Sequence, residues 1–391
     1  MKNTPDSAPS SSAPSDVLAT AIKFAAEQVA PSAAQWEREH THPRHMVTHA
    51  ATNRLCGLLV PTELGGLGLS AVHAAEVMAA IATADMGFAF SLVCHNNLAA
   101  AIAKRGSPEH KAKYLPLLLD GSMLGAFLLT EPDAGSDAGA ISTSAQPTDS
   151  RRWVINGDKA WVTNASHAQL LNVYAQTDPE AGHNGIGAFL VEAAASGVSR
   201  TEPYEMLGAH STGTGGISFS NVSVDDSSLF IEPGSAFKAA MEAIDLARTL
   251  VAAMCTAMLR HGLEVAVGYV SNRQAFGLPL SDRQGLRWML ADVATDIEAA
   301  EGLWRSAAHG LSESRPDVAI RAAHAKKFAT RVALSGLAQC MQALGANGFR
   351  QDFPLARHLA AAKMAHYLDG TTEIQNLVIA RSLFAAQPNP Q

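Results

Sequence analysis

Apolar and polar residues alternate along the chain with a period that changes twice. From Asp16 to about Asp120 the apolar residues recur at helical spacing, with helices expected at 17–29, 71–84 and 95–104. Asp16 is the expected N-cap of the first helix, since its carboxylate can accept a free N–H of the first turn. The glycines of segment 61–68 predict a loop.

Between residues 123 and 234 the pattern changes to short apolar segments rich in β-branched and aromatic residues. Glycine, asparagine, aspartate and serine separate these segments, which is typical of strands joined by turns. The sequence therefore predicts a small β-domain with strands at 125–130, 152–155, 171–176, 187–191 and 216–224.

The helical period returns at about residue 235 and holds to residue 385. Long helices are expected at 236–272, 283–310, 317–344 and 355–366, with apolar faces that bury against one another as a bundle. The predicted class is α+β and mostly α, with domains at 17–122, 123–234 and 235–391. The Ser/Pro/Ala-rich segment 1–16 is expected to be disordered.

Composition narrows the possible partners. The 391 residues are 47% hydrophobic and 17% charged, which favours a large core and burial against other subunits. A net charge of −7 without a basic run excludes nucleic acid as a partner. We expect no membrane span, a cytoplasmic location and no metal site, and the four cysteines are expected to be reduced and buried.

Two segments of the β-domain could contact a ligand. In 127–137, FLLTEPDAGSD, a strand leads into a turn whose N–H groups and hydroxyls can converge on one ligand, although a plain polar hairpin fits as well. In 156–164, NGDKAWVTN, Trp161 and Thr163 are two apart and would share one face of a strand. A flat ring beside a hydroxyl suits a planar heterocycle, but a tryptophan on a strand is also common in cores.

A third segment, HYLDGTTEIQ at 366–375, completes a pattern. Together and in this order, the three segments resemble the acyl-CoA dehydrogenase family over nearly the whole chain from about residue 17. The resemblance implies an N-terminal helical domain, a middle β-domain and a C-terminal helical bundle. It also implies bound FAD, a homotetramer or homodimer, an acyl-thioester substrate and electron-transfer flavoprotein as the acceptor.

The resemblance also assigns site residues. Thr130 would lie near the flavin pyrimidine, Ser136 near ribityl and substrate, and Trp161 with Thr163 beside the isoalloxazine. Segment 272–277 with Gln284 resembles the motif that reaches the FAD of a neighbouring subunit, where Arg273 suits the pyrophosphate. The full implied cofactor set is Phe127, Leu129, Thr130, Gly135, Ser136, Trp161, Thr163, Arg273, Phe276, Gln284, Gln342, Gly345, Thr371 and Glu373.

Substrate contacts are implied for Ser136, Asp245, Arg248 and Gly370. Asp245 to Arg248 would open the helix that lines the acyl-thioester channel. Three positions depart from the family pattern: an Arg-Asp pair is replaced by Ala360-Ala361, an arginine by His210, and a second glycine by Ala346. Some members place their base at the position of Ala247, so that alternative base is absent.

The base implied by the resemblance is Asp369, where most of the family has glutamate. In α,β-desaturation of a thioester, a carboxylate removes the α-proton while hydride leaves the β-carbon for flavin N5, and the Asp369 N–H would help to hold the thioester oxygen. Aspartate is shorter by about 1.5 Å, and a misplacement of about 1 Å can cost on the order of 10²-fold in rate.

Three outcomes are therefore open. The enzyme desaturates with a closer backbone or substrate, it uses another substrate, or it has lost desaturation. The second outcome has a concrete form, because nitroalkane oxidases share the fold and use aspartate on a small acidic substrate. Asp369 as a plain turn residue and a flavin-free relative are further interpretations, although the retained flavin-facing segments argue against the latter. The sequence does not choose between CoA and a carrier protein as the acyl carrier.

Overall fold

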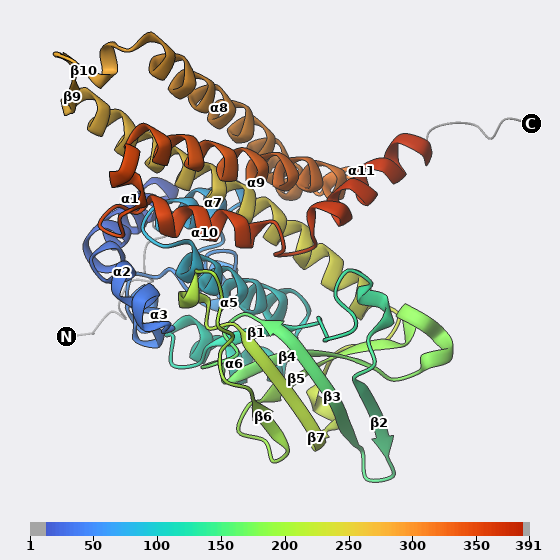
Figure 1. Cartoon of the computed structure of the whole chain (residues 1–391). Helices are drawn as coiled ribbons and strands as arrows, with labels where there is room; N and C mark the ends of the chain where they lie inside the picture. The colour runs from blue at the N-terminus through green and yellow to red at the C-terminus, as the bar shows by residue number, and fades with distance from the viewer. Residues whose placement is uncertain (1–12, 386–391) are drawn as a thin grey trace, which may run out of the picture.

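The computed structural model describes residues 13–385, which form a helical domain, a β-domain and a helical bundle in chain order (Figure 1). This arrangement confirms the predicted mostly helical α+β class. The first domain consists of α1 (Pro14–Phe24), α2 (Ala30–Glu39), α3 (Arg44–Thr52), α4 (Ala71–Ala82), α5 (Met86–Arg105) and α6 (Pro108–Leu119).

The start of α1 corrects the prediction. The helix begins at Pro14 and its N-cap is Ala13, so Asp16 lies in its first turn instead of capping it. Proline suits this place because its φ is already helical and the missing N–H would have no helical partner. The expectation of disorder is thus wrong for residues 14–16, and residues 1–12 lie outside the described part of the chain.

The helix α5 also starts earlier than its periodicity predicted, at Met86 instead of residue 95. The Asp85 side chain accepts the N–H of Phe88 at 2.8 Å and caps the helix. The early turns of α5 are buried on nearly all sides, which hides the amphipathic period from the sequence. Loop 61–68 is confirmed, apart from a single turn at Thr62–Leu64.

The β-domain holds one eight-stranded sheet in the order β6-β7-β3-β2-β4-β5-β8, with β1 pairing in parallel beside β4. The strands β2, β6 and β8 were not predicted because they are short and two are mainly polar. The strand bounds are β1 (Gly125–Leu128), β2 (Ser144–Thr148), β3 (Arg152–Val162), β4 (Leu170–Gln176), β5 (Ile186–Glu192), β6 (Val198–Arg200), β7 (Gly215–Asp225) and β8 (Leu229–Ile231).

The C-terminal helices match their predicted ranges to within two residues. They are α7 (Ala236–Asn272), α8 (Gln284–Ser312), α9 (Val318–Ala343) and α10 (Leu355–Ala365), followed by α11 (Thr372–Ala385). A hairpin of β9 (Gln274–Ala275) and β10 (Leu278–Pro279) joins α7 to α8. Because α7 begins at Ala236, Asp245 lies well inside this helix, which corrects the expectation that residues 245–248 open it.

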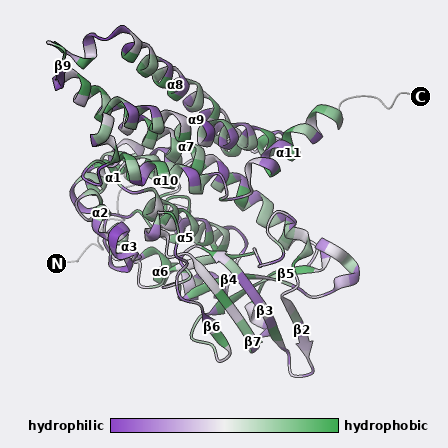
Figure 2. Ribbon diagram, viewed as in Figure 1, coloured by the Kyte–Doolittle hydropathy of each residue, from purple (hydrophilic) through white to green (hydrophobic). Residues whose placement is uncertain are grey.

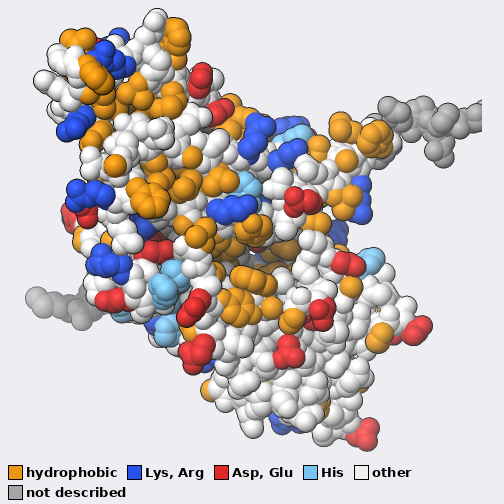
Figure 3. Space-filling view, viewed as in Figure 1, with side chains coloured by type: hydrophobic (Ala, Val, Ile, Leu, Met, Phe, Trp, Pro, Cys, Tyr) orange, Lys and Arg blue, Asp and Glu red, His pale blue; other side chains and the backbone are white. Residues whose placement is uncertain are grey.

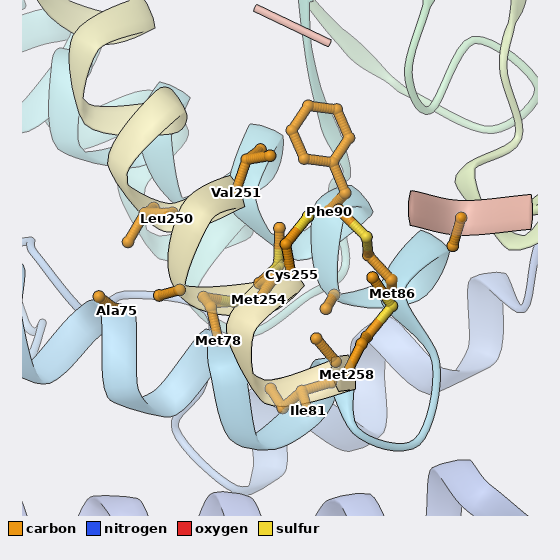
Figure 4. Close-up of a cluster of buried hydrophobic side chains, with 14 of the residues drawn as sticks. Ala75, Met78, Ile81, Met86, Phe90, Leu250, Val251, Met254, Cys255 and Met258 are labelled. Atoms are coloured by element: carbon orange, nitrogen blue, oxygen red, sulfur yellow. The ribbon is translucent and has the colours of Figure 1, made fainter. Parts of the chain in front are cut away.

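The first domain and the bundle share one core. Methionines and aliphatic residues of α4 and α5 interdigitate with those of α7, as Figure 4 shows for Met78, Met86, Phe90, Met254 and Met258. Each such side chain contributes about 1.5–3 kcal/mol when fully buried. The packing therefore fixes α5 against α7, and the next turns of both helices form the site described below.

Two helices, α5 and α7, are long and apolar enough to cross a membrane by length and composition alone. Their most apolar windows are 78% and 61% buried inside the protein, so the apolar residues are accounted for by core packing. The helices of the bundle show mixed hydrophilic and hydrophobic stretches along their length (Figure 2), as expected where one face is buried and the other is solvated.

Candidate active site

The predicted base, Asp369, lies in a tight turn between α10 and α11. Its φ is 51° and that of Gly370 is 91°, so two consecutive residues are left-handed. Glycine takes this conformation freely, and aspartate is among the few other residues that take it readily. The turn directs the Asp369 side chain into a cavity between α5 and α7.

Three buried side chains hold the turn by its carbonyl oxygens. Arg248 Nε donates to the Asp369 carbonyl at 2.8 Å. Lys326 Nζ donates to the carbonyls of His366 at 3.2 Å and Gly370 at 2.5 Å, and Gln375 Nε2 donates to Gly370 at 2.9 Å. Because these contacts go to the backbone, they fix the turn and leave the carboxylate of Asp369 free.

The Asp369 carboxyl is electrostatically poised. Its Oδ2 is buried and has no hydrogen-bond partner within residues 13–385. Burial raises the pKa of Asp369 to about 6, although Lys326 and Arg248 act in the opposite direction. A buried carboxylate without hydrogen bonds, with a pKa near the operating pH, has the properties required of a general base.

The cavity beside Asp369 has a volume of about 50 Å³. One end is formed by Asp369, Cys94 and Ala247, and the far end by Arg105, Ala239 and Ile231. On the face drawn in Figure 3, hydrophobic side chains gather in the hollow where the bundle meets the β-domain. The remaining lining residues are Asn97, Leu98, Ala101, Phe127, Asn172, Tyr174, Ala243 and Ile244.

The turn after β1 is held by a buried ion pair that the sequence analysis missed. Lys159 Nζ lies 2.7 Å from Glu131 Oε1, and both side chains are almost fully buried. Glu131 also accepts the N–H groups of Ser142 at 2.7 Å and Thr143 at 2.9 Å. Burial by itself would raise the pKa of Glu131, but Lys159 and these hydrogen bonds outweigh it and lower the pKa to about 2.

This pair shapes segment 129–143, which carries the predicted flavin contacts. Lys159 Nζ also donates to the carbonyl of Leu129 at 3.0 Å, and the N–H of Ala160 donates to Thr130 at 2.9 Å. Thr130 is half-buried, while Gly135 and Ser136 are exposed. Both charged residues stand inside the two motifs, at Glu131 and Lys159, but nothing in the sequence shows that they are buried together.

Trp161 and Thr163 depart from the expected strand geometry. The pairing of β3 with β7 shifts between Lys159 and Val162, Trp161 has a φ of 56°, and β3 ends at Val162. The regular alternation is therefore broken: Trp161 is 64% exposed and Thr163 is 8% exposed. The prediction that a regular strand places both on one face is wrong, because a bulge turns the indole outward.

Five of the predicted cofactor residues form a second cluster at the other end of α7: Arg273, Phe276, Gln284, Gln342 and Gly345. Arg273 caps α7, Phe276 is 95% exposed in the hairpin, and Gln284 begins α8. Gln342 and Gly345 lie nearby, since Asn347 Nδ2 donates to the Tyr269 hydroxyl at 2.8 Å. From Ala247 to Arg273 α7 runs 26 residues, about 39 Å at the helical rise. One chain does not bring the two clusters together (Figure 1).

The residues near Asp369 suit the predicted roles to different degrees. Arg248 is 7% exposed and pairs with Asp245 at 2.9 Å, so it is not the surface residue typical of a lone arginine. Thr371 and Glu373 lie at the start of α11, with Glu373 exposed.

His210 is one of the positions that depart from the family pattern. There, Glu37 of α2 accepts the N–H groups of Ala209 at 3.1 Å and His210 at 3.2 Å.

Thr130, Ser136 and Trp161 form the first cluster, and the chemical groups of this cluster suit a flavin. The exposed indole of Trp161 offers a flat face, and Thr130 and Ser136 add hydroxyls beside the open 132–137 turn. The Thr163 side chain interacts with the Cys94 thiol by a hydrogen bond. Planar stacking beside hydroxyl and N–H donors is the environment that an isoalloxazine ring requires.

We predict that Lys159→Met destabilises the fold by about 3–5 kcal/mol, because Glu131 would remain buried without its counter-charge. The matched control is Lys113→Met, which breaks an exposed pair with Glu192 at 2.7 Å and should cost less than about 1 kcal/mol. Urea denaturation measures both variants. Equal small losses would show that the buried pair does not stabilise the 129–143 segment.

We also predict that Asp369→Asn stabilises the protein at pH 7. Because the pKa of Asp369 is raised to about 6 in the fold, ionisation opposes folding as pH rises above the ordinary carboxyl range. The gain should reach at most about 3 kcal/mol above pH 6.5 and vanish below about pH 4. Thermal unfolding at both pH values tests this, with the exposed Asp292→Asn as control; a gain independent of pH would contradict it.

The sequence matches models of one protein family along most of its length. Family-level sequence models described as the N-terminal, middle and C-terminal domains of acyl-CoA dehydrogenase match residues 13–122, 126–222 and 234–384. The chain is 36% identical over 369 residues to the human mitochondrial short-chain specific acyl-CoA dehydrogenase, covering 94% of this chain and 89% of that protein.

Two solved structures superpose closely on this chain. Butyryl-CoA dehydrogenase from Megasphaera elsdenii superposes with a TM-score of 0.91 at 30% identity, over 97% of this chain and 100% of that one. A chain in the structure of the electron-transferring flavoprotein of Acidaminococcus fermentans superposes with a TM-score of 0.91 at 32% identity, over 95% and 97%. The chain therefore belongs to the acyl-CoA dehydrogenase family and is an FAD-dependent oxidoreductase that acts on acyl thioesters.

Proposed function

We propose that this protein desaturates a short acyl thioester between its α- and β-carbons, with Asp369 as the base. The observation that carries the proposal is the position of this carboxyl. Among residues 13–385 it is the only acid that lines the cavity, and Ala247 lines the same cavity at the position where some family members have a base. Its pKa of about 6 keeps it mostly ionised at neutral pH and still basic enough to take a proton.

The residues of the chain supply positioning and proton transfer. Bound FAD would supply the hydride acceptor, held by the Trp161 ring, Thr130 and Ser136. Asp369 Oδ2 would remove the α-proton and hold it in the dry end of the cavity. The N–H of Asp369 donates no backbone hydrogen bond within residues 13–385, so this group is available to the thioester oxygen. Arg248 and Lys326 keep that N–H in place through the carbonyls of the turn.

The size of the cavity favours a short acyl group. Its volume is about 50 Å³, and the far end is limited by Arg105, which pairs with Glu242 at 2.6 Å. The shorter reach of aspartate is compatible with this geometry if the acyl chain lies against Asp369 in a narrow space. The acyl group is offered both as a CoA thioester and on a carrier protein in the test below.

We also propose that a second copy of the chain completes the flavin site. The Arg273 cluster lies about 39 Å along α7 from Ala247, so it cannot reach the same flavin as Trp161. The cluster is surrounded by exposed aromatic and apolar side chains, with Phe276 95%, Phe349 86% and Trp288 62% exposed. Such a surface is typical of a subunit interface.

The likeness to a chain in an electron-transferring flavoprotein structure supports such a flavoprotein as the electron acceptor of this protein.

The aspartate at position 369 favours one alternative reaction. A nitroalkane-oxidase-like reaction would use the same aspartate on a small acidic substrate, with oxygen as the acceptor. The Gly370 to Gln375 segment and the thioester-specific relatives favour the dehydrogenase. Anaerobic mixing separates the two reactions, because thioesters or nitroalkanes would bleach the flavin absorption, and only the oxidase forms peroxide in air.

We predict that short acyl thioesters bleach the flavin and that Asp369→Asn slows this by at least about 10²-fold while FAD stays bound. For the wild type, kcat/KM should fall about tenfold per pH unit below the pKa of about 6, since the base must be ionised. Stopped-flow absorbance measures both. Unchanged reduction in Asp369→Asn would remove this residue from the mechanism, and bleaching by nitroalkanes alone would support the alternative.

A complementation experiment tests the shared site. We predict that Arg273→Glu and Asp369→Asn are each inactive alone and regain activity when co-expressed. In a mixed oligomer, one site combines the intact Asp369 of one copy with the intact Arg273 of the other. Arg38→Glu, an exposed change on α2, is the control and should retain flavin and activity. If the mixture stays inactive although mixed oligomers form, the site lies within one chain.

A further inference from the structure

The cavity beside Asp369 has a polar wall that desaturation itself does not use. Asn172 and Tyr174 are two residues apart on β4, so both face the cavity from the same side of the sheet. Asn97 faces it from α5. A cavity built only for an alkyl chain would be lined by apolar side chains, because each buried polar group loses its hydrogen bonds to water.

Two side-chain oxygens of this wall have no hydrogen-bond partner in the described part of the chain. Asn172 is 2% exposed and its Oδ1 is buried, and the Oδ1 of Asn97 is buried as well. Asn172 Nδ2 donates to the Tyr174 hydroxyl at 3.5 Å, which leaves the hydroxyl proton of Tyr174 free to be donated. An unmatched buried acceptor is unfavourable, because it has lost its hydrogen bonds to water. The arrangement therefore offers two acceptors and one donor to whatever enters the cavity.

The position of Asn97 and Asn172 relative to Asp369 indicates which part of the substrate they would contact. Cys94 lies beside Asp369, and Asn97 is one helical turn farther on the same face of α5. That turn advances by about 4.5–5.4 Å, or roughly three or four carbon–carbon bonds of 1.5 Å. A group that reached Asn97 and Asn172 would thus stand a few carbons beyond the α-carbon, near the end of a short acyl chain.

The charges of the cavity argue against a terminal carboxylate. Arg105 is the cation that lines the far end, and Glu242 already pairs with it at 2.6 Å. The unpartnered oxygens of Asn97 and Asn172 would repel a carboxylate, which can only accept hydrogen bonds. A hydrogen-bond donor suits these oxygens: a hydroxyl can donate to one of them while it accepts from Tyr174, and an amino group can donate to both.

We propose that the acyl group carries a hydrogen-bond-donating substituent, a hydroxyl or an amino group, near its distal end, held by Asn97, Asn172 and Tyr174. This assignment rests on the proposed thioester desaturation and narrows its substrate class. It makes these three residues the specificity determinants of the site, separate from the base.

The test compares two thioesters with the same number of non-hydrogen atoms, ω-hydroxypentanoyl and hexanoyl, by kcat/KM for flavin reduction. We expect the hydroxyl substrate to be favoured by at least tenfold, because the alkyl chain leaves buried acceptors unpaired. The ω-aminopentanoyl thioester distinguishes an amino group from a hydroxyl, and the ω-carboxy analogue of the same chain should be the poorest.

Two variants locate the effect. Asn172→Leu and Asn97→Leu should each lower the ratio of hydroxyl to alkyl substrate about tenfold or more, mainly through the loss with the hydroxyl substrate. Ile244→Leu changes the same cavity without changing its polarity and should leave the ratio as in the wild type. Using both asparagine positions keeps the test informative if one variant fails to fold.

The outcomes separate this inference from the proposed function. Reduction by alkyl thioesters as fast as, or faster than, by donor-bearing ones would overturn the inference and leave desaturation standing. A wild-type ratio in both asparagine variants would also overturn it. If no thioester of the panel reduces the flavin, the proposed function fails and this inference fails with it.

Discussion

The packing of α7 against α4, α5 and α9 is the constraint on which the rest of the structure depends. Within this one helix, Leu250, Met254 and Met258 fill the shared core, Ala247 and Arg248 lie beside Asp369, and Arg273 stands at the far end. The small side chains of Ala239, Ala243 and Ala247 leave room for the cavity beside this part of α7. A shift of α7 would therefore change the core, the cavity and the distance between the Asp369 and Arg273 regions together.

Buried cations organise both halves of the site by the same means. Lys326 and Arg248 donate to carbonyls of the Asp369 turn, and Lys159 donates to the carbonyl of Leu129 while it pairs with Glu131. Burial lowers the pKa of Lys326 and that of Lys159 to about 8 in each case. These groups hold irregular backbone in one conformation where a helix or strand ladder cannot, and the desolvation they suffer is offset by charge-assisted hydrogen bonds.

Asp369 combines three requirements that conflict in ordinary structure: a left-handed backbone, a buried carboxyl and freedom from hydrogen bonds. The surrounding groups meet them by binding only the main chain of the turn. In the cavity this carboxyl then faces a wall that is polar at Asn172 and Tyr174. Asp369 and the polar wall thus belong to one pocket, and the pocket limits what can approach this carboxyl.

The sequence by itself determined the order of the domains, the long bundle helices and the family, because helical periodicity over many residues and dense local motifs are local properties. It also indicated Asp369, Arg248 and Trp161. Only the tertiary structure showed the Glu131–Lys159 pair, the bulge that turns Trp161 outward, the carbonyl contacts of Lys326 and the unpartnered oxygens of Asn97 and Asn172. These features join residues far apart in the chain, and burial, which sets their charge and hydrogen bonding, is decided by packing that no local pattern records.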